Sequence, residues 1–199
     1  LDPDIKVVCF DVQGTLSNKS FGDYFWLETL PELYSNFYEI SLEESKEQLK
    51  VFFKEIGCYD LRFYSAHYWL NRLSVEKSLR DILDESPVEP HQNHKAVDLL
   101  NECANKEYKL IALSATHLEF IDIELDGLHK YFVDVYSCID DFETAGKPDS
   151  IYDKIVEKLE ISSRELCNIG DNKEMDVDNA RSAGCQAMLW PDEFITISR

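Results

Sequence analysis

Side chains that could hold a phosphoryl group lie beyond four short apolar segments of the chain. They are Asp11, Ser114, Lys147 and Asp171, with Asp176 five positions after the last of them. Carboxylates, a hydroxyl and a lysine are the groups that bind a phosphoryl group together with a divalent cation. The residue types therefore predict phosphoryl chemistry, provided that the fold brings these positions to one place.

Each of these residues has an expected role that follows from its atoms. Asp11 is the candidate nucleophile, because a carboxylate can attack phosphorus and form an acyl phosphate. Ser114 and nearby backbone N–H groups, such as that of Ala115, are expected to hold the phosphoryl oxygens. Lys147 would neutralise the charge that develops on those oxygens.

Other oxygen atoms in the same segments are suited to a metal ion. Asp11 and Asp171, together with a backbone carbonyl, offer the hard ligands that Mg²⁺ prefers, and water would complete the shell. Asp176 is expected to open a helix, where its charge favours the helix dipole and can orient Lys147 or the metal. We therefore expect Mg²⁺ as the cofactor.

The apolar segments that carry these residues resemble buried parallel strands. They are short, rich in β-branched and other apolar residues, and each ends in polar or small residues. Segments with helical periodicity alternate with them, which predicts a doubly wound parallel α/β sheet of the Rossmann-like kind, with ligands at the carboxyl ends of the strands. The expected strands are 5–10, 110–113, 132–136, 166–169 and 186–190, and the expected helices are about 93–106, 118–125, 149–159 and 176–183.

One long interval interrupts this alternation. From about Ser20 to Ser86 the apolar and aromatic residues recur at helical spacing and no strand is indicated. The simplest interpretation is a helical domain of residues 17–87, inserted into a core made of residues 1–16 and 88–199. Its aromatic residues are expected to form the core of that insert, with one or two at a substrate entrance; they include Trp26, Tyr59, Tyr64, Tyr68 and Trp69.

Composition restricts the partners of the protein. The 199 residues carry a net charge of -19, and 44% of them are hydrophobic, which is enough for a buried core. A chain this acidic is repelled by phosphate backbones and anionic lipid, so we expect neither nucleic acid nor a membrane as a partner. Six scattered cysteines and the lack of a long apolar segment favour a cytoplasmic protein with buried thiols.

The ordered motifs resemble those of the haloacid dehalogenase superfamily. These motifs are Asp11-Val12-Gln13-Gly14-Thr15-Leu16, Ser114, Lys147-Pro148, and Gly170-Asp171 with Asp176. The resemblance covers nearly the whole chain, and the helical insert stands where that superfamily carries its C1-type cap. It implies a magnesium-dependent phosphatase that acts on a small phosphorylated metabolite. It implies no oligomeric state.

Gln13 departs from the pattern of that superfamily. Phosphatases of the family carry a second Asp at this position, which protonates the leaving group and then activates water. Gln13 can hydrogen-bond a leaving oxygen, and its backbone carbonyl can bind Mg²⁺, but its side chain cannot transfer a proton. Loss of a general acid/base typically lowers a rate by ~10²–10⁴.

Three interpretations fit this substitution. The first is a weak phosphatase, the second is a phospho-ligand-binding protein without turnover, and the third is a phosphonatase-like hydrolase that uses a lysine of the cap. Lys46, Lys50 and Lys54 are the cap lysines, but their spacing among glutamates favours a solvated helix face. Carbon–halogen hydrolysis fits least, because that branch has Ser-Asn where this chain has Gly170-Asp171. Phosphatase-like hydrolysis ranks first.

Overall fold

A five-stranded parallel sheet forms the centre of the computed structural model, which describes residues 2–191. The strand order is β3-β2-β1-β4-β5, and all four neighbouring pairs are parallel. This confirms the predicted α/β architecture. The strands are β1 (Val7–Phe10), β2 (Lys109–Ser114), β3 (Asp134–Ser137), β4 (Leu166–Gly170) and β5 (Gln186–Leu189).

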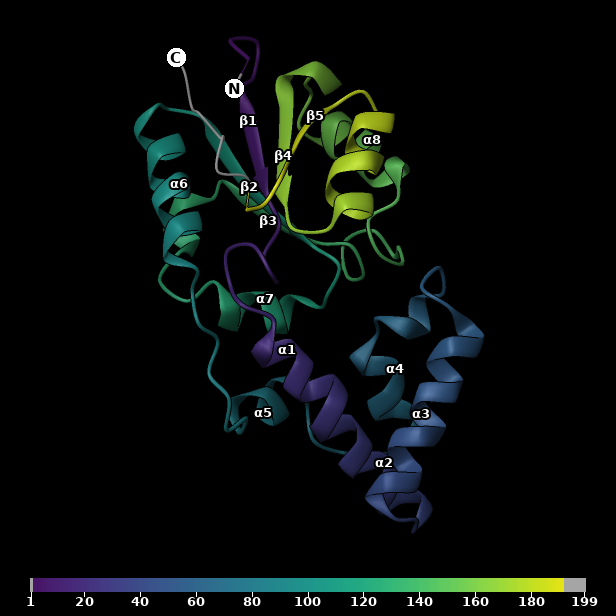
Figure 1. The fold of residues 1–199 in the computed structure, drawn as a ribbon. Coiled ribbons are helices and arrows are strands. Elements are labelled where there is room, and N and C mark those ends of the chain that lie inside the picture. The colour runs from purple at the N-terminus through teal and green to yellow at the C-terminus, as the bar shows by residue number, and fades with distance from the viewer. Residues whose placement is uncertain (1, 192–199) are drawn as a thin grey trace.

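Helices cover both faces of this sheet, as Figure 1 shows. On one face, α6 (His94–Asn105) and α7 (Leu118–Glu124) pack with β1 and β2, and on the other, α8 (Asp149–Lys158) and α9 (Asn179–Ser182) pack with β4 and β5. Strands β1 and β2 are buried on both faces of the sheet. Successive residues of each strand belong alternately to two hydrophobic clusters, one on each face. Short 3-10 helices occupy His129–Tyr131 and Ser163–Glu165.

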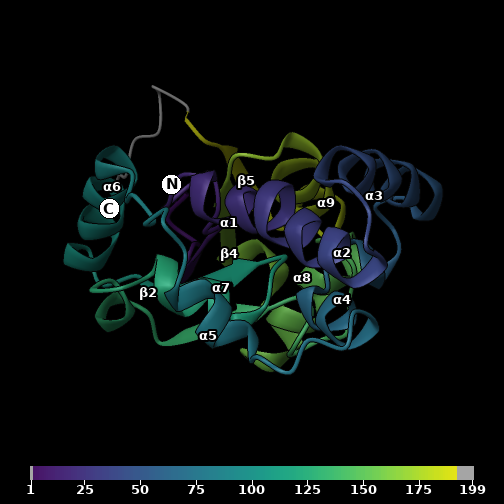
Figure 2. The same cartoon turned by 90° about the horizontal axis from the view of Figure 1, so that it is seen from below.

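Between β1 and α6 the named elements of the described chain are all helices, joined by turns and loops. This segment contains α1 (Ser20–Tyr24), a π-helical turn (Phe25–Thr29), α2 (Leu30–Tyr38), α3 (Leu42–Ile56), a 3-10 turn (Leu61–Phe63), α4 (Ala66–Arg72) and α5 (Leu79–Asp84). The longest helix, α3, begins at a capping box in which Ser41 and Glu44 each accept a hydrogen bond from the other's backbone. Seen from below in Figure 2, these helices lie across the end of the sheet.

The inserted helices have a hydrophobic core of their own, with Trp69 fully buried in it. One member of this cluster, Phe120, comes from α7 of the sheet layer. Its ring packs edge to face against Phe21 and Phe25, with centroid distances of 6.0 and 5.3 Å. The insert and the sheet layer therefore share a continuous apolar contact at α7.

Several expectations need correction. Cys58 is exposed, whereas the other five cysteines are buried. Tyr59 is 85% exposed and so does not belong to the core of the insert.

Residues 1 and 192–199, which the predicted domain boundaries include, lie outside the described residues. Within 2–191, none of the helices combines the length and the apolar character needed to cross a bilayer.

Candidate active site

All seven predicted site residues line one cavity. It has a volume of about 820 Å³ and lies at the carboxyl ends of the strands. Parallel neighbours end at the same edge of a sheet, so residues far apart in sequence meet there. The seven residues are Asp11, Gln13, Ser114, Ala115, Lys147, Asp171 and Asp176.

Lys147 is buried between two carboxylates. Its Nζ atom lies 2.5 Å from Oδ1 of Asp11 and 2.7 Å from Oδ1 of Asp176, and all three side chains are at most 7% exposed. Burial alone lowers the pKa of Lys147, but the two negative charges outweigh it and hold the pKa well above its ordinary value. The lysine therefore stays charged and fixes the position of both carboxylates.

Asp11 has a partner on each of its carboxylate oxygens. Besides Lys147 on Oδ1, the hydroxyl of Thr15 donates to Oδ2 at 3.0 Å. Burial raises the pKa of Asp11 to about 7, while the charge of Lys147 lowers it and that of Asp176 raises it. A nearby cation would favour the ionised form, which is the form that can act as a nucleophile.

Asp176 lies within a helical turn and does not open it, contrary to the expectation. The π-helical segment spans Lys173–Asp178, and its N-cap is Asn172, whose side chain accepts from the backbone N–H of Met175. Asp176 instead bonds with both oxygens, to Lys147 and to the backbone N–H of Asn172 at 3.0 Å. A Cβ on Gly170 would lie 2.2 Å from the carboxyl carbon of Asp176, so only glycine fits there.

Three carboxylates in this cavity fit a hard divalent cation. One oxygen from each of Asp11, Asp171 and Asp176 lies within 4.8 Å of the others. Oxygen-only donors with two or more negative charges are the set that Mg²⁺ binds, with waters in the remaining positions. The donor set therefore fits the expected cofactor, although Asp176 already uses both of its oxygens in hydrogen bonds.

A lysine missed by the sequence analysis lies against the same carboxylates. Lys19 Nζ is 2.6 Å from Oδ2 of Asp171, and its pKa is raised chiefly by this hydrogen bond. The turn at Gly14, with φ of +93°, lets the chain pass so close that a Cβ there would be 2.5 Å from Asp171 Oδ2. Lys19 would therefore compete with a metal ion for the carboxylate of Asp171.

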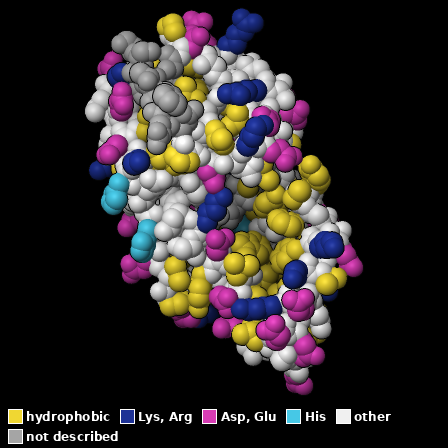
Figure 3. All heavy atoms as spheres, viewed as in Figure 1, with side chains coloured by type: hydrophobic (Ala, Val, Ile, Leu, Met, Phe, Trp, Pro, Cys, Tyr) yellow, Lys and Arg dark blue, Asp and Glu magenta, His cyan; other side chains and the backbone are white. Residues whose placement is uncertain are grey.

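The inserted helices form the opposite wall of the cavity. Figure 3 shows the hollow between the sheet part and these helices, with hydrophobic side chains gathered around it. Aromatic surface comes from Trp26, Phe53, Phe63 and Tyr64. Two of them, Trp26 and Tyr64, are among the aromatic residues of which one or two were expected at the entrance. Lys46 also lines the cavity, paired with Glu28 at 2.7 Å, so it does not simply belong to a solvated helix face.

The Gln13 side chain points towards the start of the insert. Its amide nitrogen would be only 2.3 Å from a Cβ on Gly22, so the absence of a side chain at Gly22 provides its space. Glu124, at the end of α7, is 1% exposed and lies beside Gln13. Within residues 2–191, neither the Gln13 amide nitrogen nor the carboxyl oxygens of Glu124 have a well-formed hydrogen bond.

Glu124 is expected to make the stability of the protein depend on pH. Burial raises the pKa of Glu124 well above its ordinary value of 4.5, and the Gln13 amide lowers it only in part. The folded chain therefore binds this proton more tightly than the unfolded chain does. Stability that is fully present below about pH 4.5 is then lost as pH rises towards the raised pKa, by about 1.4 kcal/mol per unit.

Glu124→Gln keeps the shape of the side chain and removes this titration. We expect the variant to be more stable than the natural chain at pH 8 and to differ little from it at pH 4.5, as measured by urea unfolding. Asp122→Asn, on the exposed side of the same helix, is the matched control and should change neither value by much. An equal gain at both pH values would contradict the assignment.

The fold and this cavity together define a Rossmann-like α/β protein with a helical insert and a carboxylate-lined site at the ends of its strands. Comparison with known proteins identifies its family directly, because residues 5–184 match the haloacid dehalogenase-like hydrolase family. The chain belongs to the haloacid dehalogenase-like hydrolases.

Two solved structures of this family resemble the chain over most of its length. A HAD phosphatase from Thermococcus onnurineus aligns with a TM-score of 0.78 and 22% identity, over 96% of this chain and 89% of that one. The putative HAD-hydrolase YfnB from Bacillus subtilis, bound to magnesium, aligns with a TM-score of 0.63 and 17% identity, over 97% and 92% of the two chains. Both likenesses concern the fold.

A curated relative matches a shorter segment. It is the GMP/IMP nucleotidase YrfG of Escherichia coli, 26% identical over 73 residues, which are 37% of this chain. The matched segment covers 32% of the length of that nucleotidase.

Proposed function

We propose that the protein is a phosphatase that cleaves small phosphomonoesters through a phosphorylated Asp11. The observation that carries this proposal is the buried position of Lys147 between Asp11 and Asp176, with Asp171 close by. A buried cation beside a reactive carboxylate is suited to an anionic substrate, because it offsets the charge that the phosphoryl group brings into the cavity.

In the proposed reaction the carboxylate of Asp11 attacks phosphorus. The P–O bond to the leaving group breaks, and an acyl phosphate forms on Asp11; water then hydrolyses this bond and releases phosphate. Lys147 holds one phosphoryl oxygen by charge, and Ser114 with the backbone N–H of Ala115 holds others. Magnesium, when bound by Asp11, Asp171 and the Gln13 carbonyl, would offset phosphoryl charge and favour ionised Asp11.

Proton transfer to the leaving oxygen limits the rate of the proposed reaction. The leaving oxygen needs a proton, and the amide of Gln13 can donate a hydrogen bond to it without giving one up. A leaving group that is stable as an anion, such as a phenolate, needs less help. We therefore propose slow turnover with ordinary esters, and a protein that binds phospho-ligands without turnover remains the second interpretation.

The phosphonatase-like interpretation has less support. It needs a cap lysine without a counter-charge, so that the amine can be neutral and attack a carbonyl. Two cap lysines line the cavity, Lys46 and Lys50, and Lys50 pairs with Glu47 at 3.7 Å. Glu28 contacts Lys46 through both carboxylate oxygens, at 2.7 and 2.9 Å. A lysine held in an ion pair by both oxygens of a carboxylate is not free to attack a carbonyl.

Residues 17–87 are proposed to act as the cap that selects the substrate. Aromatic side chains of this segment line the cavity, which favours a leaving group with a flat ring. A purine nucleotide has such a ring, and the partial likeness to a GMP/IMP nucleotidase supports nucleotidase activity as a specific form of the proposal.

We propose a cytoplasmic setting and no nucleic-acid or membrane partner, as the acidic charge favours.

A single assay tests the proposal. With p-nitrophenyl phosphate and Mg²⁺, we expect slow release of p-nitrophenol that stops on addition of EDTA and in Asp11→Asn. The same preparations given GMP or IMP should release phosphate if the ring is recognised. Equal background rates for the natural chain and Asp11→Asn would reject catalysis, and binding of inorganic phosphate by calorimetry would then support the phospho-ligand-binding interpretation.

A further inference from the structure

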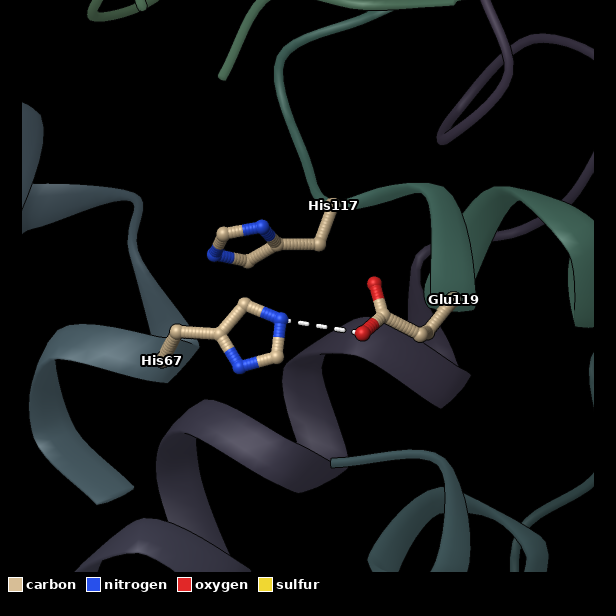
Figure 4. Close-up of side chains that lie close together, drawn as sticks. All are labelled: His67, His117 and Glu119. Atoms are coloured by element: carbon tan, nitrogen blue, oxygen red, sulfur yellow. Dashed lines mark hydrogen bonds and ion pairs between the residues drawn. The ribbon is translucent and has the colours of Figure 1, made fainter. Parts of the chain in front are cut away.

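A second group of metal-binding side chains lies at the contact between the insert and the sheet layer. His67 comes from α4, Glu119 from the first turn of α7, and His117 from the residue just before α7. Figure 4 shows the three side chains converging, with the two imidazole rings edge to face at a centroid distance of 4.4 Å. One candidate ligand atom from each residue lies within 4.8 Å of the others.

The hydrogen bonds around His117 resemble those of a metal-binding histidine. Asp140 accepts a hydrogen bond from Nδ1 of His117 at 2.6 Å and is itself held by the backbone N–H of Leu118 at 2.7 Å. Metal-binding histidines commonly donate one ring nitrogen to a carboxylate, which leaves the other nitrogen with a lone pair for the metal. In His117 that second nitrogen is Nε2, whose neighbour is the Ser65 hydroxyl at 3.3 Å.

We propose that His67, His117 and Glu119 bind a transition-metal ion such as Zn²⁺, and that this ion fastens the insert to the sheet layer. Two imidazoles and one carboxylate are a known ligand set for zinc, with water in the fourth position. The proposal does not depend on phosphatase activity, because its residues are separate from the carboxylate site.

Rotation of the His67 and Glu119 side chains would bring the candidate ligand atoms, which lie within 4.8 Å of one another, closer to the spacing of a zinc site. Around zinc, neighbouring ligand atoms lie roughly 3.3 Å apart. Nε2 of His67 is already 2.9 Å from Oε1 of Glu119, so the ion would replace the proton that these two atoms share. The His67 and Glu119 side chains are 45% and 30% exposed and can rotate towards His117, which is 3% exposed and held by Asp140.

His117 connects this group to the active site. It belongs to the loop between β2 and α7, where its side chain is 3% exposed and held by Asp140. Thr116, the residue before His117, lines the active-site cavity. An ion held here would therefore fix both the position of α4 and the loop that follows β2.

Zinc titration by calorimetry, with excess Mg²⁺ present, tests this proposal. The natural chain contains an exposed thiol, so Cys58→Ser serves as the reference protein. We expect one equivalent of Zn²⁺ to bind, and the melting temperature to rise with it. His67→Ala should weaken binding by more than the ~10–100-fold that loss of a supporting carboxylate costs, and Asp140→Asn should cost that amount.

Two matched variants distinguish this site from the rest of the surface. His91→Ala removes an exposed histidine outside this group and should leave zinc affinity unchanged. Asp171→Asn should also leave it unchanged, because that residue belongs to the carboxylate site. Binding that survives His67→Ala, or that is lost in Asp171→Asn, would overturn the proposal, as would the absence of any zinc binding.

Discussion

Gln13→Asp should raise the rate of phosphomonoester hydrolysis by about 10²–10⁴-fold, which is the usual contribution of a general acid/base. Gln13 lines the cavity that holds Asp11, and its amide nitrogen is buried beside Glu124 without a well-formed hydrogen bond among the described residues. An aspartate is shorter than glutamine and fits the same space. Its carboxyl could donate a proton to the leaving oxygen and then take one from water.

The comparison is made with an alkyl phosphate and with p-nitrophenyl phosphate. The gain should be larger for the alkyl ester, because its leaving oxygen is more basic and depends more on a proton donor. Gln13→Asn is the matched control, since it has the length of aspartate without the acid, and it should stay at the natural rate. If Gln13→Asp and Gln13→Asn behave alike, the cavity lacks more than an acid, and the phospho-ligand-binding interpretation gains support.

Lys147→Met should abolish turnover and destabilise the fold by about 3–5 kcal/mol, because it leaves two buried carboxylates without their cation. Asp11 and Asp176 both contact Nζ directly, and within residues 2–191 no other lysine forms an ion pair with both carboxylates. Methionine keeps the length and most of the volume of the side chain. The loss therefore reports charge and not packing.

Chemical unfolding at pH 7 measures this loss. Lys173→Met is the control: that lysine pairs with Asp178 at the surface and should matter little. Adding Asp176→Asn to Lys147→Met should restore part of the stability, because one of the two unpaired charges is removed. A stability loss equal to that of Lys173→Met would contradict the buried ion-pair assignment.

The positions at the strand ends could be predicted because their local signals are strong. Val7–Phe10 and Leu166–Gly170 are short apolar segments that end at polar residues, and parallel strands bring such ends together. Helix boundaries near Asp171 were harder, since both Asn172 and Asp176 are plausible N-caps. In the structure Asn172 is the N-cap, because the carboxylate of Asp176 is hydrogen-bonded to Lys147 and to a backbone N–H.

Contacts between the insert and the sheet layer could not be predicted from local patterns. His67 and His117 are fifty positions apart, and the burial of Glu124 depends on how α7 packs beside Gln13. Lys19 reaches Asp171 only because the chain turns tightly at Gly14. Each of these pairings depends on tertiary geometry, for which a single sequence offers no periodic signal.

The packing of Phe120 joins the inserted helices and the sheet layer into one cooperative unit. This ring is fully buried among residues of the insert, yet it belongs to a helix of the sheet layer. Exposing a phenylalanine costs about 1.5–3 kcal/mol. Any movement of the insert that separates Phe21 and Phe25 from Phe120 carries this free-energy cost. The arrangement in which the insert contacts the sheet layer is therefore favoured over one in which the two are apart.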